Sequence, residues 1–233
     1  MSNALITIYG DSITKGVLME GGRYLINSTG ISALAQQFSL MIRNRSKFGC
    51  TIDKGLVRIR HDLEGTEAAP RVTVLEYGGN DSDFDWSKVA AEPDGEHQPK
   101  TPLDRFQELY KQAIDLVRSH GSEPVLMSLP PICPGRYLNW ICREGLSRER
   151  ILHWLGEENT IYRWQEMYSQ TVCAIAEETG AALIDVRSAF LKNRRIDGLI
   201  CDDGIHPNAR GQKLILDTCS GFLASRGYTP QPA

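Results

Sequence analysis

Three short polar clusters combine residue types that could carry nucleophilic acyl chemistry. They are Gly10-Asp11-Ser12, Gly78-Gly79-Asn80-Asp81 and Asp202-Asp203-Gly204-Ile205-His206-Pro207. A serine hydroxyl becomes a useful nucleophile when a nearby base removes its proton, and histidine is suited to that role near neutral pH. The first cluster could therefore supply the nucleophile, Ser12, and the third its base, His206.

The third cluster also holds a carboxylate that could orient the base. Asp203 lies three residues before His206, close enough to hold the imidazole in one tautomer from a single turn. Asp202 is the rival for this role. Each residue alone also has a plainer interpretation, because Ser12 can cap a helix and Asp203 can serve as a turn residue.

Asn80 is a candidate donor to the negative oxygen that develops during acyl transfer. Its side-chain amide follows two glycines, and the same sequence is also good turn chemistry. The sequence around Asn80 leaves both interpretations open.

Strands and helices are predicted to alternate along the chain, and the clusters follow the strands. Expected strands cover residues 5–9, 39–43, 71–77, 124–129 and 181–185, and expected helices cover 30–38, 54–63, 102–119, 147–155, 159–179 and 207–224, with Pro207 as a first helical residue. Such alternation indicates one three-layer α/β domain over residues 1–233, with an inserted segment at about 130–165. Its sheet should be mainly parallel, so the three clusters, each taken to stand directly behind a strand, should meet at one edge.

The clusters together resemble the SGNH/GDSL hydrolases. A fourth block, Asn44-Arg-Ser-Lys-Phe-Gly49-Cys-Thr51, completes the family set in the family order. The resemblance implies a flavodoxin-like sandwich with five parallel strands. It also implies a carboxylic ester hydrolase that works through an acyl-enzyme without a metal or cofactor.

The resemblance implies a role for each matching residue. Ser12 would be the nucleophile and Asp203 would orient the general base, His206, since the family spacing selects Asp203 over Asp202. The oxyanion hole would comprise the N–H groups of Ser12 and Gly49 and the side chain of Asn80.

Aromatic residues indicate where substrate choice could lie. Trp86 falls in the connection 78–100, and Trp140, Trp154 and Trp164 fall within the inserted segment. Their rings could stack on sugars or line an acyl cleft, or they could simply pack the insertion onto the body.

Together with Asp11, the four tryptophans are the predicted substrate-binding residues. The expected substrate is a small acylated carbohydrate, with a short-chain or lysophospholipid acyl ester as the alternative. A non-catalytic ligand-binding module on the same fold is the alternative from another class.

Composition excludes several other classes of partner. The net charge is −3 and no long run of like charge occurs, so nucleic acid and anionic membranes are not expected partners. The N-terminus lacks the pattern of a signal peptide, which favours a cytoplasmic location unless a leader was trimmed. Six dispersed cysteines are then expected to be reduced and mostly buried. The expected partner is a small-molecule ester, and self-association is left open.

Overall fold

The computed structural model describes residues 5–65 and 70–231. Five strands form a parallel sheet in the order β4-β1-β5-β6-β7. They are β1 (Leu5–Gly10), β4 (Met41–Asn44), β5 (Val72–Glu76), β6 (Glu123–Met127) and β7 (Ala182–Ile184). This order is that of flavodoxin-like sheets, and it confirms the predicted α/β sandwich with five parallel strands.

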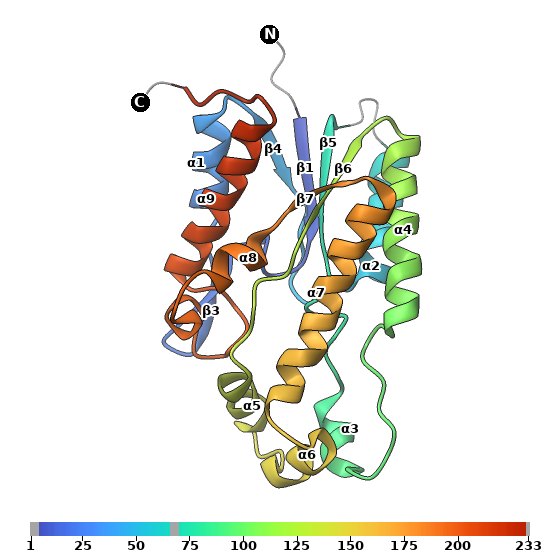
Figure 1. The fold of residues 1–233 in the computed structure, drawn as a ribbon, viewed down its shortest axis with the longest axis vertical. Coiled ribbons are helices and arrows are strands. Elements are labelled where there is room, and N and C mark those ends of the chain that lie inside the picture. The colour runs from blue at the N-terminus through green and yellow to red at the C-terminus, as the bar shows by residue number, and fades with distance from the viewer. Residues whose placement is uncertain (1–4, 66–69, 232–233) are drawn as a thin grey trace.

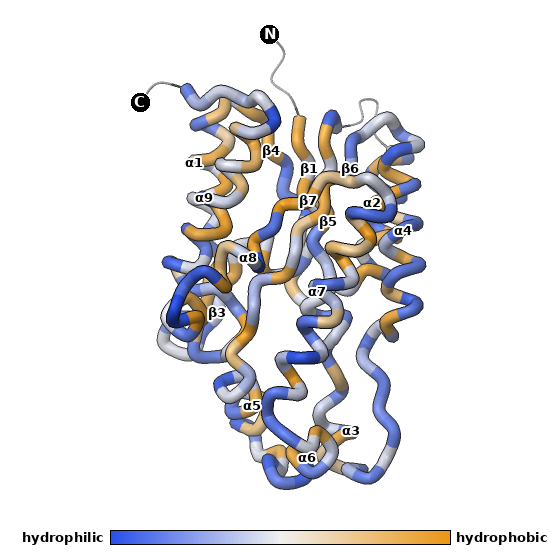
Figure 2. Tube along the Cα trace, in the orientation of Figure 1, coloured by the Kyte–Doolittle hydropathy of each residue, from blue (hydrophilic) through white to orange (hydrophobic). Residues whose placement is uncertain are grey.

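Helices cover both faces of the sheet (Figure 1). On one face lie α1 (Thr29–Gln37), α8 (Val186–Leu191) and α9 (Ala209–Ser225), and on the other lie α2 (Ile52–Glu64), α4 (Leu103–Ser119) and α7 (Asn159–Thr179). Strands buried on both faces have near-continuous apolar sequences. All five residues of β5 are buried, and the strands of the sheet include hydrophobic, orange stretches in Figure 2.

A third group of helices lies beyond the carboxyl ends of the strands, at the bottom of Figure 1. It comprises α3 (Trp86–Ala91), α5 (Pro134–Cys142) and α6 (Arg148–Leu155), which share an apolar cluster with the start of α7. The predicted short helix over 147–155 is confirmed by α6.

The inserted segment is attached closely to the loop that carries Asp203 and His206. Cys133 donates its N–H to the carbonyl of Gly204 at 2.8 Å. A Cβ atom on Gly204 would lie 2.3 Å from the backbone nitrogen of Tyr137, and the φ angle of Gly204 is +81°. Only glycine permits this approach, so α5 and the Asp203–His206 loop form one packed unit.

The sequence did not predict the antiparallel hairpin formed by β2 (Val17–Glu20) and β3 (Arg23–Ile26). Gly21 and Gly22 connect its strands with positive φ angles, which is the backbone that two-residue hairpin loops require. The helices α3, α5 and α8 and the 3-10 helix η1 (Ile196–Leu199) were also not predicted.

Two detailed predictions about the last cluster were wrong. It does not directly follow the last strand, because α8 and η1 lie between β7 and Asp203. Pro207 is not the first residue of the last helix, because it pairs in an isolated bridge with Ile200. The helix begins at Ala209, where the Asn208 side chain caps it by accepting two backbone N–H groups.

The six cysteines are free thiols. Cys50 and Cys201 are buried and the other four are partly buried, so the thiols are less deeply placed than expected. Within residues 5–65 and 70–231, no helix has both the length and the apolar character needed to cross a bilayer.

Candidate active site

The structure brings Ser12, His206 and Asp203 into one chain of hydrogen bonds. Ser12 Oγ lies 2.9 Å from His206 Nε2, and His206 Nδ1 lies 2.6 Å from Asp203 Oδ2. The other Asp203 oxygen accepts the backbone N–H groups of Ile205 and His206, both at 3.1 Å. All three side chains are buried. This arrangement allows a histidine, oriented by a carboxylate, to take a proton from a serine hydroxyl.

The environment of Asp203 favours its ionised form. Burial alone would raise the pKa of Asp203, but hydrogen bonds and charge from His206, together with two backbone N–H groups, hold it below its ordinary value. Asp202 belongs to the same turn and is exposed to solvent. The geometry therefore favours Asp203 over Asp202 as the partner of His206.

The turn after β1 presents Ser12 at the end of the sheet. Asp11 Oδ1 accepts the N–H of Ile13 at 2.8 Å, and Val17 donates its N–H to the carbonyl of Ser12 at 2.9 Å. Asp11 is buried, and its other oxygen accepts the amide of Asn80 at 2.8 Å. Asp11 thus holds both the Ser12 turn and Asn80, and its carboxylate is occupied by these contacts although it borders the cavity described below.

A second carboxyl, that of Glu76, lies behind this turn. Glu76 is fully buried, and Oε2 accepts the hydroxyl of Thr14 at 3.1 Å. Burial and the neighbouring Asp11 carboxylate raise the pKa of Glu76 well above its ordinary value. This shift favours the protonated form of Glu76, which limits repulsion between the two carboxyls.

Gly49 occupies a tight turn beside Ser12. Its φ angle is +67°, which favours glycine. Lys47 donates its N–H to the carbonyl of Gly10 at 2.9 Å, and Cys50 donates to the carbonyl of Lys47 at 3.2 Å. These bonds attach the turn to the end of β1. The assignment of Gly49 N–H to the oxyanion hole remains a prediction.

A cavity of about 370 Å³ opens beside Ser12, His206 and Asn80. Its inner wall is mostly apolar and comes from the inserted helices and the loops before them. The apolar residues are Phe84, Trp86, Leu129, Pro130, Ile132, Ile141, Leu146, Ile161 and Trp164.

The polar groups of the inner wall bind one another. Asp83 Oδ1 accepts the Tyr137 hydroxyl at 2.7 Å and the Trp86 indole N–H at 2.8 Å. Lys100 forms a 2.7 Å ion pair with the other oxygen of Asp83. Gln165 donates to the carbonyl of Pro130 at 2.9 Å. The wall therefore presents few unpaired polar atoms to a bound molecule.

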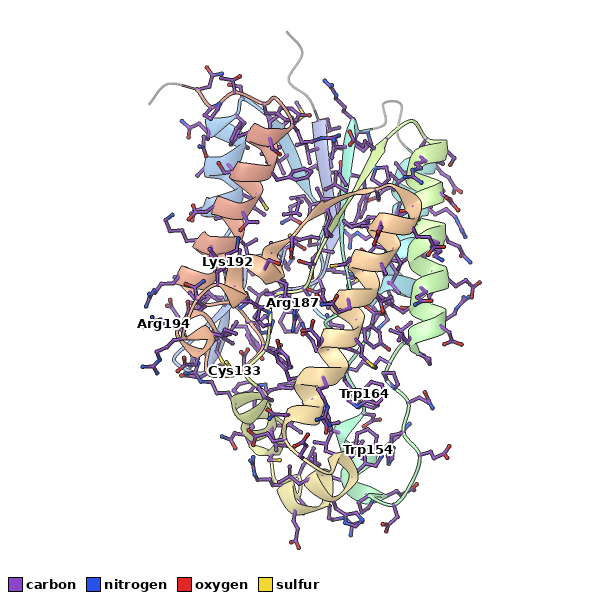
Figure 3. All side chains as sticks on the ribbon, in the orientation of Figure 1. Cys133, Trp154, Trp164, Arg187, Lys192 and Arg194 are labelled. Atoms are coloured by element: carbon purple, nitrogen blue, oxygen red, sulfur yellow. The ribbon has the colours of Figure 1, made fainter. Side chains whose placement is uncertain are left out.

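The four predicted tryptophans have different positions. Trp86, Trp140 and Trp164 line the cavity, whereas Trp154 does not. Trp154 packs edge-on against Phe84, with ring centroids 4.9 Å apart. Figure 3 shows Trp154 and Trp164 beyond the sheet, close to the lower end of α7. For Trp154 the structure favours the alternative in which the ring packs the insertion onto the body.

Sequence reasoning missed two aromatic residues beside His206. Tyr24, on β3, lies edge-on to the His206 ring at 5.1 Å, and Phe48 lies nearly parallel to it at 5.8 Å. The pair Gly21-Gly22 between two β-rich stretches was a signal for the hairpin that carries Tyr24. For Phe48 the signal was its position directly before Gly49, a predicted member of the oxyanion hole.

Asp81, the last residue of the second cluster, binds other parts of the protein and does not line the cavity. Its Oδ1 accepts the N–H of Ile52 at 3.0 Å and the hydroxyl of Thr101 at 2.7 Å. Its Oδ2 is buried without a hydrogen-bond partner in the described part of the chain. Burial raises the pKa of Asp81 to about 7.

This position predicts a pH-dependent contribution of Asp81 to stability. The carboxyl of an unfolded chain titrates near 4, as a model carboxyl does, so the folded state holds the extra proton between about pH 4 and 7. The contribution is full below about pH 4 and is lost as pH rises through about 7. Asp81→Asn removes the titration, so its unfolding free energy should fall less than that of wild type between pH 5 and 8, by on the order of 2 kcal/mol.

Urea unfolding at pH 5 and pH 8 measures this difference. Asp115→Asn is the matched control, because Asp115 is an exposed residue of α4. Equal pH dependence in wild type and Asp81→Asn would contradict the prediction.

No cluster of three or more His, Cys, Asp or Glu side chains within the described ranges is arranged to hold a metal ion.

Comparisons with known proteins show the family and the fold of the chain. Residues 8–214 match the GDSL-like Lipase/Acylhydrolase family. The chain is 21% identical over 214 residues to the isoamyl acetate-hydrolyzing esterase 1 homolog of Bos taurus, a match that covers 90% of this chain and 77% of the relative.

Two solved structures show the same fold. A lipase/acylhydrolase from Enterococcus faecalis superposes with a TM-score of 0.67 at 19% identity, covering 99% of this chain and 100% of that one. A catalytic mutant of an acetylxylan esterase from Geobacillus stearothermophilus gives 0.63 at 20% identity, covering 97% and 95%.

Proposed function

The chain belongs to the GDSL-like Lipase/Acylhydrolase family and is a carboxylic ester hydrolase, and from this premise we propose that Ser12, His206 and Asp203 cleave small esters through an acyl-enzyme. The observation that carries the proposal is the unbroken hydrogen-bond chain from Asp203 to Ser12 at the mouth of an apolar cavity. Family membership and this intact chain of side chains disfavour the non-catalytic binding module.

The proposed reaction has two halves. Ser12 Oγ attacks the carbonyl carbon while His206 Nε2 takes the hydroxyl proton, and the resulting oxyanion is stabilised by the N–H groups of Ser12 and Gly49 and the amide of Asn80. His206 then protonates the leaving alkoxide, and the bond between the carbonyl carbon and the alcohol oxygen breaks. Water, activated by His206, attacks the acyl-enzyme and releases the acid.

The cavity favours an apolar ester over an acylated sugar. A sugar would need partners for its hydroxyl groups, and leaving them unpaired in an apolar site is costly. The polar atoms of Asp83, Tyr137 and Gln165 already bind each other or neighbouring groups. Of the two substrate classes that the sequence left open, the carbohydrate was favoured, and the cavity supports the short-chain acyl ester.

The names of the relatives support a short acyl group. One relative is named for hydrolysis of isoamyl acetate, and one structural neighbour is an acetylxylan esterase. Both names contain an acetyl ester, although the alcohols differ. The names support the short acyl chain of the proposed substrate, and the cavity supports its apolar character.

A series of esters with one alcohol and increasing acyl length tests this choice. Each methylene buried against the cavity wall contributes about 0.8 kcal/mol, or about fourfold in kcat/KM. We expect kcat/KM to rise from acetyl to butanoyl or hexanoyl, as more methylenes contact the apolar wall, and to be lower for dodecanoyl, as a short-chain enzyme requires.

Peracetylated glucose and butyl acetate separate the two substrate classes. Faster hydrolysis of butyl acetate supports the apolar ester. A clear preference for the sugar acetate would restore the carbohydrate interpretation, and a preference for dodecanoyl esters would exclude a short-chain enzyme.

A further inference from the structure

Three aromatic side chains form a rim around the entrance of the cavity. This aromatic rim consists of Tyr24, Phe48 and Trp140, which come from β3, the turn before Gly49, and α5. The Tyr24 ring lies 5.3 Å from Phe48 and 6.0 Å from Trp140, measured between ring centroids. Tyr24 is 40% exposed and Phe48 is 50% exposed. Neighbouring aromatic rings left open to solvent indicate a surface that binds something.

The aromatic rim is in contact with the catalytic histidine. Tyr24 and Phe48 both pack against the His206 ring, one edge-on and the other nearly parallel to it. His206 Nε2 faces Ser12 at 2.9 Å. Any group that receives a proton from His206 therefore sits within reach of these two rings.

The chemistry of acyl transfer determines which half of the ester receives the proton from His206 and therefore lies next to the aromatic rim. His206 must come within hydrogen-bond distance, about 3 Å, of the leaving alcohol oxygen in order to protonate it. The carbonyl oxygen faces Asn80 instead. The acyl chain is then directed toward the buried inner wall, which includes Phe84, Leu129 and Ile132.

We propose that the aromatic rim binds the alcohol half of the ester and that Tyr24 selects alcohols carrying a planar apolar group. This inference rests on the proposed function, because it assumes that His206 protonates an alcohol. Planar rings pack against aromatic side chains in edge-on or offset arrangements, which add to the gain from burial alone.

The charges around the aromatic rim favour a neutral alcohol. The Arg143 guanidinium lies 3.7 Å from the Trp140 ring centroid and is paired with Glu144 at 2.8 Å. Burial and the Asp203 carboxylate raise the pKa of Tyr24 to about 12, so its hydroxyl remains neutral. The Arg143 charge beside the rim is therefore already paired, and the Tyr24 hydroxyl carries no charge.

Three acetates with different alcohols test the proposal. Benzyl, cyclohexylmethyl and methyl acetate share the acyl group and have unactivated leaving groups. Tyr24→Ala should lower kcat/KM about tenfold for benzyl acetate and less than twofold for methyl acetate. Tyr24→Leu keeps an apolar side chain without a planar ring, so it should abolish the preference for benzyl over cyclohexylmethyl. Tyr24→Phe keeps the planar ring, so it should keep the preference for benzyl over cyclohexylmethyl acetate.

Leu25→Ala is the matched control. Leu25 is the next residue of β3, is 47% exposed and does not line the cavity. It tests whether any truncation in the hairpin has the same effect. A benzyl-specific loss in Leu25→Ala equal to that in Tyr24→Ala would overturn the proposal.

The rate of deacylation distinguishes alcohol binding from a merely structural role of Tyr24. A structural role would affect acylation and deacylation alike. The alcohol has left before water attacks, so the rate of acyl-enzyme hydrolysis after a burst should be the same in wild type and Tyr24→Ala. A slowed deacylation, or a changed acyl-length preference with an unchanged alcohol preference, would overturn the role of Tyr24. If wild type hydrolyses no ester and a fluorophosphonate probe does not label Ser12, the proposed function itself fails.

Discussion

Ser12→Ala is expected to reduce ester hydrolysis by about 10⁴- to 10⁶-fold, the range seen when the nucleophile of a serine hydrolase is removed. In the proposed reaction the hydroxyl oxygen of Ser12 forms the acyl-enzyme, and it lies 2.9 Å from His206 Nε2. The backbone N–H groups and Asn80 remain, so a small residual rate above the uncatalysed reaction is expected. Turnover of butyl acetate and labelling by a fluorophosphonate probe measure the effect.

The fold should survive this substitution. Ser12 Oγ hydrogen-bonds His206 at the cavity, where water can replace it, so the unfolding free energy should change by no more than about 1 kcal/mol. Ser122→Ala is the matched control, because Ser122 is also a buried serine and its hydroxyl lies 2.8 Å from that of Thr73. It should retain full activity. Activity of Ser12→Ala above a few per cent of wild type would refute the nucleophile assignment.

The parts of the site that the sequence could predict lie either just after a buried strand or within one local turn. Ser12 and Asn80 each lie a few residues after a buried strand, and parallel strands bring their carboxyl ends to one edge. Asp203 and His206 are linked by a local turn, so their contact depends on spacing rather than on the global fold. The topology of the sheet therefore accounts for Ser12 and Asn80, and local spacing accounts for Asp203 and His206. That the two pairs meet was implied by the family resemblance, because the last cluster does not directly follow a strand.

The residues of the cavity wall could not be assigned in the same way. Trp154 and Trp164 lie only ten positions apart on neighbouring helices, yet one packs behind Phe84 and the other lines the cavity. Which face a ring presents depends on how α5, α6 and α7 pack together, and the sequence does not specify that packing. Tyr24 reaches His206 from the β2–β3 hairpin, a separate two-stranded sheet whose position the sequence does not specify.

Strand limits were least predictable at the edge of the sheet. The predicted strand 39–43 is observed as Met41–Asn44, on a strand with no fully buried residue. Ser39 has a φ angle of +50°, a left-handed backbone that does not continue a strand. An edge strand lacks the apolar pattern that marked residues 71–77, so its limits depend on pairing with β1.

Asp203→Asn is expected to reduce kcat by about 10⁴-fold, whereas Asp202→Asn should have less than a twofold effect. The carboxylate accepts the Nδ1–H of His206 at 2.6 Å, which leaves Nε2 free to take the proton of Ser12. An asparagine amide would donate to Nδ1 instead and place the imidazole proton on Nε2. The base is then in the wrong tautomer although the geometry is preserved.

The paired variants separate orientation of the base from general loss of charge. Both substitutions remove one negative charge from the same turn, but only Asp203 is buried against His206. Steady-state kinetics with butyl acetate, together with thermal unfolding of each variant, provide the comparison. Asn at 203 can still accept the N–H groups of Ile205 and His206, so both proteins should fold. A larger loss for Asp202→Asn than for Asp203→Asn would reverse the assignment. Because Asp202 is exposed to solvent, that result would also mean that the turn rearranges to bring Asp202 to His206.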